Sequence, residues 1–264
     1  MNKKYETLEV SWKQPYTILL VLNRPEHSNA FNTKMAIELS NFFEELVLLK
    51  EMCRAVVLTG AGDKAFSAGG DLKERLGMDL KSWQSQHIVF ERMINLIIDC
   101  EVPIIGAING AAFGGGCEMV AALDFSYASE NATFAQTETK IGIIPGIGGT
   151  QNLSRAIGEQ RAKELIFSAK PFSAKQALEW GLINEIFPSS TLLAETLKTA
   201  SIITQNAPIA VKQAKSAIHN GLQMTVSKGM KFELKCYNKT IRTKDRVEGV
   251  LAFNEKRAPK FEGK

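Results

Sequence analysis

The chain has 264 residues, of which 45% are hydrophobic and 23% are charged, and its formal net charge at pH 7 is +4. This length and composition exclude a disordered chain and predict one large soluble globular domain, with or without a smaller appendage. The small positive charge suits an anionic small-molecule ligand but is too weak by itself to indicate a nucleic-acid partner.

The reactive side chains and the N-terminus narrow the class of protein further. The four cysteines form no CxxC pair, which predicts free thiols in a reducing compartment. The three histidines follow no metal-ligand spacing, so no metal site is expected. The N-terminus lacks the apolar segment of a signal peptide, and no apolar run reaches the roughly 18 residues of a membrane span. We therefore expect a cytoplasmic protein without a membrane partner; a processed organellar protein is the alternative.

The first two thirds of the chain alternate between strand-like and helix-like segments. Residues 35–46 and 83–97 repeat apolar side chains at helical spacing, and Asn32 or Thr33 can cap the first of these helices. His87, on the second helix, is expected to pack at the edge of the core rather than to act as a ligand. A short helix is expected over residues 117–123. Strands are expected over residues 18–22, 55–59, 104–108, 125–128 and 133–135. This alternation predicts an α/β layered domain.

The character of the chain changes near residue 190. No convincing strand follows residue 191, and helical segments dominate, with a helix C-cap expected at Asn220–Gly221. We therefore expect a core over residues 1–195 and a helical region over residues 196–264. A helical tail of this length can barely build its own core, so it is expected to pack on the core domain or on a neighbouring subunit.

Two glycine-rich segments carry most of the functional signal. They are KAFSAGGDL at residues 64–72 and NGAAFGGGCE at residues 109–118, and both place glycines directly after a strand. Glycine permits close approach of a ligand, and unpaired backbone N–H groups in such loops can point at a negatively charged oxygen. Two donors from separate loops would form an oxyanion hole. Each loop taken singly is also explained by a tight turn.

Two glutamates lie near these segments and could carry acid–base chemistry. Glu118 falls in the first turn of the glycine-led helix, where it could simply complement the helix dipole. Glu138 follows a strand and could be an exposed loop carboxylate. Sequence spacing does not bring the two together. If they converge, one water molecule can bridge them and general acid–base catalysis becomes possible.

These segments together resemble the enoyl-CoA hydratase (crotonase) superfamily, and the resemblance covers nearly the entire chain. It rests on FSAGGDLKE, INGAAFGGGCE, ATFAQTETKIGIIPGIGGTQ and GEQRAKELIFSAKPFSAKQALEWGLINEIF. It implies an α/β fold, a crotonase-like spiral of repeated strand–strand–helix units with a C-terminal α-helical trimerisation region. It also implies an acyl-CoA substrate and no separate cofactor, because coenzyme A is part of the substrate.

The resemblance assigns roles to individual residues. It implies that Gly70 and Gly115 donate the two N–H groups of an oxyanion hole, that Glu118 activates the attacking water, and that Glu138 supplies the α-carbon proton. The residues implied to line the site for adenine and pantetheine are Ala68, Gly69, Gly70, Asp71, Leu72 and Lys73. The presence of both glutamates favours an enoyl-CoA hydratase. An enoyl-CoA isomerase or another acyl-CoA lyase is the first alternative, and a CoA-ester- or RNA-binding protein with an inactive site is the second.

Within the superfamily, TETKIGIIPGIGGTQ, AKELIFSAK and TKDRVEGVLAFNEKRAPKFEGK are similar to the methylglutaconyl-CoA hydratase branch, also called AU-binding enoyl-CoA hydratases. The implied substrate is a 2-enoyl-CoA thioester. In this branch it is 3-methylglutaconyl-CoA, whose second carboxylate would need a cation. Arg75 is one candidate, with a solvated side chain as the alternative. Asn152 departs from the family, which usually has arginine there, and is expected to alter a structural hydrogen bond.

Nucleic-acid binding is not expected, although RNA binding through a lysine-rich helix is known in that branch. The matching stretch, residues 72–99, holds only Lys73, Arg75, Lys81 and Arg92 as cations. So few cations give little of the electrostatic attraction that RNA binding needs.

The C-terminal tail resembles the family's oligomerisation region, which implies a homotrimer or a homohexamer built as a dimer of trimers. Phe253 and Lys256 match positions that reach a neighbour's CoA site. A lysine there could meet the 3′-phosphate of CoA. A solvated cation at a helix end is the alternative for Lys256.

Overall fold

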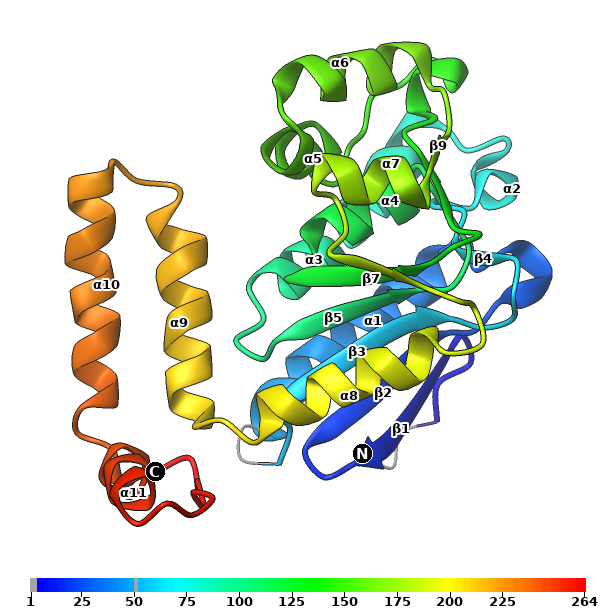
Figure 1. The fold of residues 1–264 in the computed structure, drawn as a ribbon. Coiled ribbons are helices and arrows are strands. Elements are labelled where there is room, and N and C mark those ends of the chain that lie inside the picture. Colours follow the sequence, from blue (N-terminus) through cyan, green and yellow to red (C-terminus); the bar gives the residue numbers. More distant parts are fainter. Residues whose placement is uncertain (1–3, 50–51) are drawn as a thin grey trace.

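A computed structural model describes residues 4–49 and 52–264 of the chain. Its centre is a six-stranded sheet with the order β1-β2-β3-β5-β7-β10 (Figure 1). The strands are β1 (Leu8–Gln14), β2 (Thr17–Leu22), β3 (Ala55–Gly60), β5 (Ile104–Ile108), β7 (Phe125–Ser129) and β10 (Glu185–Phe187). Only β1 runs antiparallel to its neighbour, and the other pairs are parallel.

A second sheet of four short strands accompanies the first. Its order is β4-β6-β8-β9, with β4 (Ala65–Ser67), β6 (Ala111–Phe113), β8 (Thr133–Ala135) and β9 (Phe172–Ser173). From β3 to β8, successive strands alternate between the large and the small sheet. This alternation is the repeated strand–strand–helix spiral that the resemblance implied.

Alternate side chains of the large sheet face two different layers of helices. Leu58 belongs to the core that the sheet shares with α1 (Thr33–Leu46) and α3 (Leu80–Ile98). Its neighbour Val57 points the other way, into a smaller cluster under α8 (Leu192–Thr204). Figure 1 shows α8 crossing one face of the sheet while α1 lies behind it. The expected division between residues 195 and 196 falls within α8.

The core also contains shorter helices and turns. They are α2 (Leu72–Arg75), α4 (Gly115–Ala122), α5 (Gly149–Ile157), α6 (Glu159–Ser168), α7 (Ala174–Trp180) and the 3₁₀ turns η1 (Pro25–His27), η2 (Val47–Leu49) and η3 (Glu138–Ile141). Of these, α4 and α7 contact the small sheet. The side chain of Asn32 accepts a hydrogen bond from Met35 N, as its predicted capping role requires. The predicted helices and strands of this part of the chain are confirmed, with small shifts at their ends.

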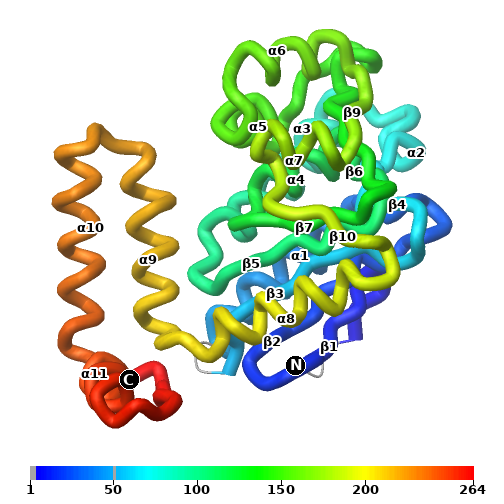
Figure 2. The backbone as a smooth tube through the Cα atoms, in the orientation of Figure 1, coloured from blue at the N-terminus to red at the C-terminus, as the bar shows by residue number. Residues whose placement is uncertain are grey.

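The C-terminal region is helical, as predicted, and no strand follows residue 191 among the described residues. Helices α9 (Pro208–Gly221) and α10 (Val226–Thr240) run side by side, and α11 (Lys244–Asn254) lies below them, apart from the sheet (Figures 1 and 2). Lys215 Nζ on α9 forms an ion pair with Asp124 Oδ2 of the core, at 2.7 Å.

The predicted helix C-cap at Asn220–Gly221 is wrong. Gly221 is the last residue of α9, and the capping residue is Leu222, which has right-handed helical angles. Close packing of α9 and α10 needs a glycine at residue 229, where an added Cβ would lie 3.2 Å from Gly221 O, whereas a Cβ added at Gly221 would lie 3.9 Å from Gly229 Cα, an ordinary contact. The turn is closed by bonds that run back to the last residues of α9, such as Gln223 N to Asn220 O.

Two further properties of the described residues bear on the sequence-based expectations. All four cysteines are free thiols, and Cys53, Cys117 and Cys236 are buried. No helix within residues 4–49 and 52–264 is both long and apolar enough to cross a membrane.

The two-layer core predicts a clear contrast between two leucines. Leu58 is fully buried in the central strand β3, whereas Leu48 in η2 is 84% exposed. We expect Leu58→Ala to lower the free energy of unfolding by about 2–5 kcal/mol, because it removes buried methyl groups and leaves a cavity. Leu48→Ala is the matched control and should change it by less than about 0.5 kcal/mol. Urea unfolding followed by circular dichroism measures both; equal effects would contradict this core arrangement.

Candidate active site

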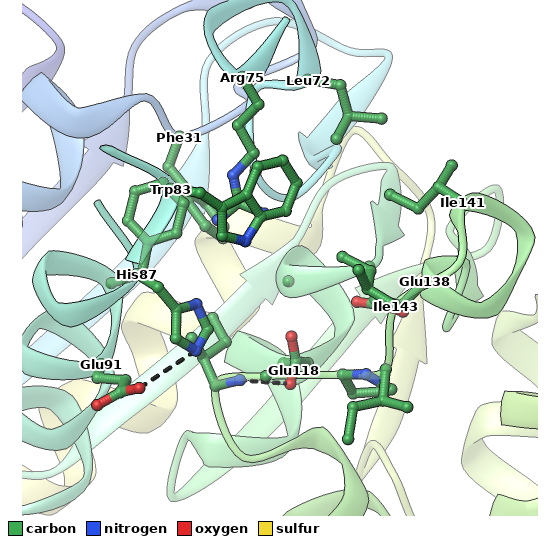
Figure 3. A pocket seen from close by; sticks show the side chains of 18 of the residues that line it. Phe31, Leu72, Arg75, Trp83, His87, Glu91, Glu118, Glu138, Ile141 and Ile143 are labelled. Atoms are coloured by element: carbon green, nitrogen blue, oxygen red, sulfur yellow. Dashed lines mark hydrogen bonds and ion pairs between the residues drawn. The ribbon is translucent and has the colours of Figure 1, made fainter. Parts of the chain in front are cut away.

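A cavity of about 920 Å³ opens beside the small sheet, within the size range of small-molecule sites. Its walls come from the loop after β4, from α2, α3 and α4, and from residues 137–147 (Figure 3). Most of the lining side chains are apolar, and a few ionisable groups converge among them: Arg75, His87, Glu91, Glu118 and Glu138.

The first glycine loop is held in place by Phe31. Phe31 N donates to Gly69 O at 2.8 Å, and Asp71 N donates to Phe31 O at 3.1 Å. These two bonds are those of a parallel bridge between Phe31 and Gly70. Phe31 makes both hydrogen bonds of this bridge, so the N–H of Gly70 points away from Phe31. The pairing therefore leaves the N–H of Gly70 without a hydrogen bond to Phe31, and Gly70 lines the cavity.

The second glycine loop meets the first at the start of α4. Gly115 is the first residue of that helix, so its N–H has no partner within the helix. A Cβ on Gly69 would lie only 2.7 Å from Gly115 N, and Gly69 has a φ of +85°. Only glycine fits at residue 69. The contact brings the neighbouring Gly70 and Gly115 to one wall of the cavity, where both are lining residues.

Glu118 is a buried carboxylate fixed by backbone donors. It is 2% exposed, and its Oε1 accepts hydrogen bonds from Ile147 N at 2.9 Å and Gly149 N at 2.7 Å. Gly149 begins α5, so the carboxylate sits at a helix N-terminus. Burial raises the pKa of Glu118, and the backbone hydrogen bonds oppose that rise because they favour the ionised form.

Glu138 lines the same cavity as Glu118 and lies in the turn η3 that follows β8 (Figure 3). It is 7% exposed, and its Oε2 is buried without a hydrogen-bond partner among the described residues. Burial, and then the charge of Glu118, raise the pKa of Glu138 to about 7. The structure thus brings to one cavity two glutamates that sequence spacing could not connect, and burial raises the pKa of both.

The other residues named from the sequence fall into three groups. Ala68 and Leu72 line the cavity together with Gly70. Asp71 does not; its side chain caps α2 and accepts from Arg24 Nη1 at 2.9 Å. Lys73 is exposed on α2.

The two C-terminal candidates lie far from the cavity of their own chain. Phe253, near the end of α11, is 84% exposed. Lys256 follows the same helix and is also exposed. Figure 1 places α11 beyond α9 and α10, away from α4. Within one chain these residues do not join the site.

Sequence reasoning missed much of the cavity wall. His87, expected at the core edge, lines the cavity, and its Nε2 lies 3.2 Å from Glu91 Oε1. The wall facing it is the apolar segment 141–147, whose Ile141 and Ile144 are exposed. The available signal was this unusually apolar run, IGIIPGI, between a strand and a helix. No cluster of ligands suited to a metal ion occurs in the described part of the chain.

Comparisons with known proteins agree over almost the whole chain. The family model for enoyl-CoA hydratase/isomerase matches residues 14–264. A short-chain-enoyl-CoA hydratase of Clostridium acetobutylicum is 38% identical over 251 residues, covering 95% of each protein. A mitochondrial enoyl-CoA hydratase of Pongo abelii is 39% identical over 263 residues, 98% of this chain and 88% of that protein. The crystal structure of an enoyl-CoA hydratase from Bacillus anthracis is 41% identical, with a TM-score of 0.95 and coverage of 98% and 100%. The chain belongs to the enoyl-CoA hydratase/isomerase family.

Proposed function

We propose that the protein is an enoyl-CoA hydratase that adds water across the α,β double bond of a 2-enoyl-CoA thioester. The observation that carries this proposal is the position of two buried carboxylates, Glu118 and Glu138, on one cavity beside the N–H groups of Gly70 and Gly115. An acid and a base on either side of a double bond can deliver the two parts of water. The hydratases among the relatives support the same reaction.

The N–H groups of Gly70 and Gly115 would bind the thioester oxygen. As water adds to the β-carbon, electrons move onto that oxygen and give it enolate character. Donors already fixed by the two glycine loops stabilise this charge more in the transition state than in the ground state. One such donor is worth about 3 kcal/mol.

The environments of the two glutamates support one assignment of the acid and the base. Glu118 accepts two backbone hydrogen bonds, which favour its ionised form, so it takes a proton from the attacking water. Glu138 has a raised pKa and an unpartnered oxygen, so it is the protonated member that donates to the α-carbon. The hydroxide part of the water bonds to the β-carbon. The glutamate pair still holds one proton at the end of the reaction, but on Glu118 instead of Glu138.

The parts of the substrate away from the reacting atoms would bind to other residues of the chain. Ala68 and Leu72 would contact the pantetheine arm, and 3-methylglutaconyl-CoA is the proposed acyl substrate. The tail carries large exposed apolar side chains, among them Met230, Leu234 and Phe253, which suit packing against further copies of the chain. In such a homotrimer or hexamer, Phe253 and Lys256 would reach a neighbour's CoA.

Replacing either glutamate tests the assignment directly. We expect Glu118→Gln and Glu138→Gln each to lower kcat for crotonyl-CoA hydration by at least about 100-fold, because each removes a proton-transfer group. Binding of the CoA ester should be largely kept. The loss of enoyl-thioester absorbance, with 3-hydroxyacyl-CoA identified by mass spectrometry, measures the reaction.

The exposed Glu164 on α6 provides the matched control, since Glu164→Gln makes the same chemical change away from the cavity. Near-normal turnover in either catalytic variant would refute the proposed roles. Double-bond migration without hydration in the unaltered protein would instead favour the isomerase.

The pH dependence tests the shared proton. In the proposed mechanism only the singly protonated pair is active, so kcat/KM should follow a bell-shaped pH profile. Hydration neither releases nor consumes a proton overall. The hydration and dehydration reactions should therefore share the same profile. Because the pKa of Glu138 is raised to about 7, the alkaline limb should fall near pH 7 as the pair loses its proton. Initial rates between pH 5 and pH 10 measure this. A profile that stays flat from pH 7 to 9 would rule out Glu138 as the acid.

A further inference from the structure

His87 marks a point at which two walls of the cavity touch. It lies on α3 and lines the cavity, and the facing wall is the segment 141–147 (Figure 3). A Cβ added at Gly146 would lie only 2.7 Å from His87 Cε1 and 3.2 Å from its Nε2. The imidazole ring therefore packs directly against the backbone of Gly146, and the proposed hydration chemistry gives this ring no part.

The ring of His87 is oriented by Glu91, which lies four residues further along α3. Its Nε2 lies 3.2 Å from Glu91 Oε1, and the ring makes no other polar contact within the described chain. Side chains four residues apart lie on the same face of a helix, so α3 alone sets the position of the ring. Both side chains are partly exposed, so the pair adds little to stability, and its effect is to fix the ring that contacts Gly146.

The backbone that His87 contacts is the backbone that holds Glu118. Glu118 Oε1 accepts hydrogen bonds from Ile147 N at 2.9 Å and from Gly149 N at 2.7 Å, and these donors closely follow residue 146. Burial raises the pKa of this carboxylate, and the N–H groups of Gly149, Ile147 and Gly146 oppose that rise. His87 and Glu118 therefore contact the same few residues.

We propose that His87 is a positioning residue for the base, since by packing against Gly146 it keeps the N–H groups that follow aimed at Glu118. This inference rests on the proposed role of Glu118 in hydration. Gly146 has no side chain with which to anchor its backbone, and Ile144 before it is exposed. Without the ring, the donors would be free to turn toward the open cavity. A buried carboxylate that loses hydrogen bonds takes up a proton more readily and is less available as a base.

Removing the ring and then replacing it tests this support. We expect His87→Ala to lower kcat for crotonyl-CoA by about tenfold and to change KM by less than about twofold, because it weakens hydrogen bonds to the charged base rather than contacts with the substrate. The acid limb of the pH profile should move to higher pH, since Glu118 would gain a proton more readily. His87→Phe keeps a ring against Gly146 and should retain at least about half of kcat. Initial rates of enoyl-thioester loss across the pH range measure these effects.

Gly146→Ala approaches the same contact from the other side. Its added Cβ would collide with His87 Cε1, so it should also lower kcat by about tenfold. In the double variant the methyl group occupies space that the ring has left. Gly146→Ala combined with His87→Ala should therefore be more active than Gly146→Ala alone, a departure from additivity that residues in contact show.

These variants leave the other ionisable side chains near Glu118 in place: Cys117 of α4, Glu138 of η3, and Arg75 and Glu91 on the cavity wall. His219→Ala, at an exposed histidine of α9, is the matched control and should leave the rates unchanged. An acid limb that does not move in His87→Ala, or a double variant no more active than Gly146→Ala, would overturn the support. A higher KM with unchanged kcat would overturn it too, because His87 would then bind substrate. If the unaltered protein does not hydrate crotonyl-CoA, the proposed function fails and this inference with it.

Discussion

The parallel pairing of β4 with β6 is the constraint on which the site depends. Parallel neighbours end at the same edge of a sheet, so the two glycine loops that follow them meet there. The two segments meet so closely that a Cβ on Gly69 would lie 2.7 Å from Gly115 N and a Cβ on Gly116 would lie closer still to Ser67 O. The strands are only three residues long, and they are held because each belongs to a strand–strand–helix unit whose longer strand is buried in the large sheet.

The same arrangement explains why the glutamates sit where they do. Glu118 comes one turn after Gly114, and its backbone N donates to Gly114 O. Glu138 follows β8, the next strand of the small sheet, and Gly114 N donates to Ala135 O on that strand. The proposed oxyanion donors and both carboxylates are therefore placed by three adjacent strands.

The sequence predicted the elements whose physical signal is local. The buried faces of α1 and α3 repeat at helical spacing, and β3 and β5 are continuous apolar runs, so their types and approximate bounds follow from short-range pattern. Strands β4 and β6 were missed because three residues show no period. The C-cap at Gly221 was wrong because this glycine remains inside α9, and Leu222, with right-handed helical angles, takes the capping position. The convergence of the glutamates is a tertiary property, and the family resemblance supplied it.

The raised pKa of Glu138 has a consequence for folding. Its value in the folded protein, about 7, lies above its ordinary value of 4.5. The folded state therefore binds this proton more tightly than the unfolded chain does, and the stability that this adds is fully present below pH 4.5. That stability is lost as the pH rises through about 7, up to about 3 kcal/mol for a shift of this size. Glu138 thus makes the folded protein less stable in alkaline solution, and if it is the proposed catalytic acid, catalysis and folding share one titration.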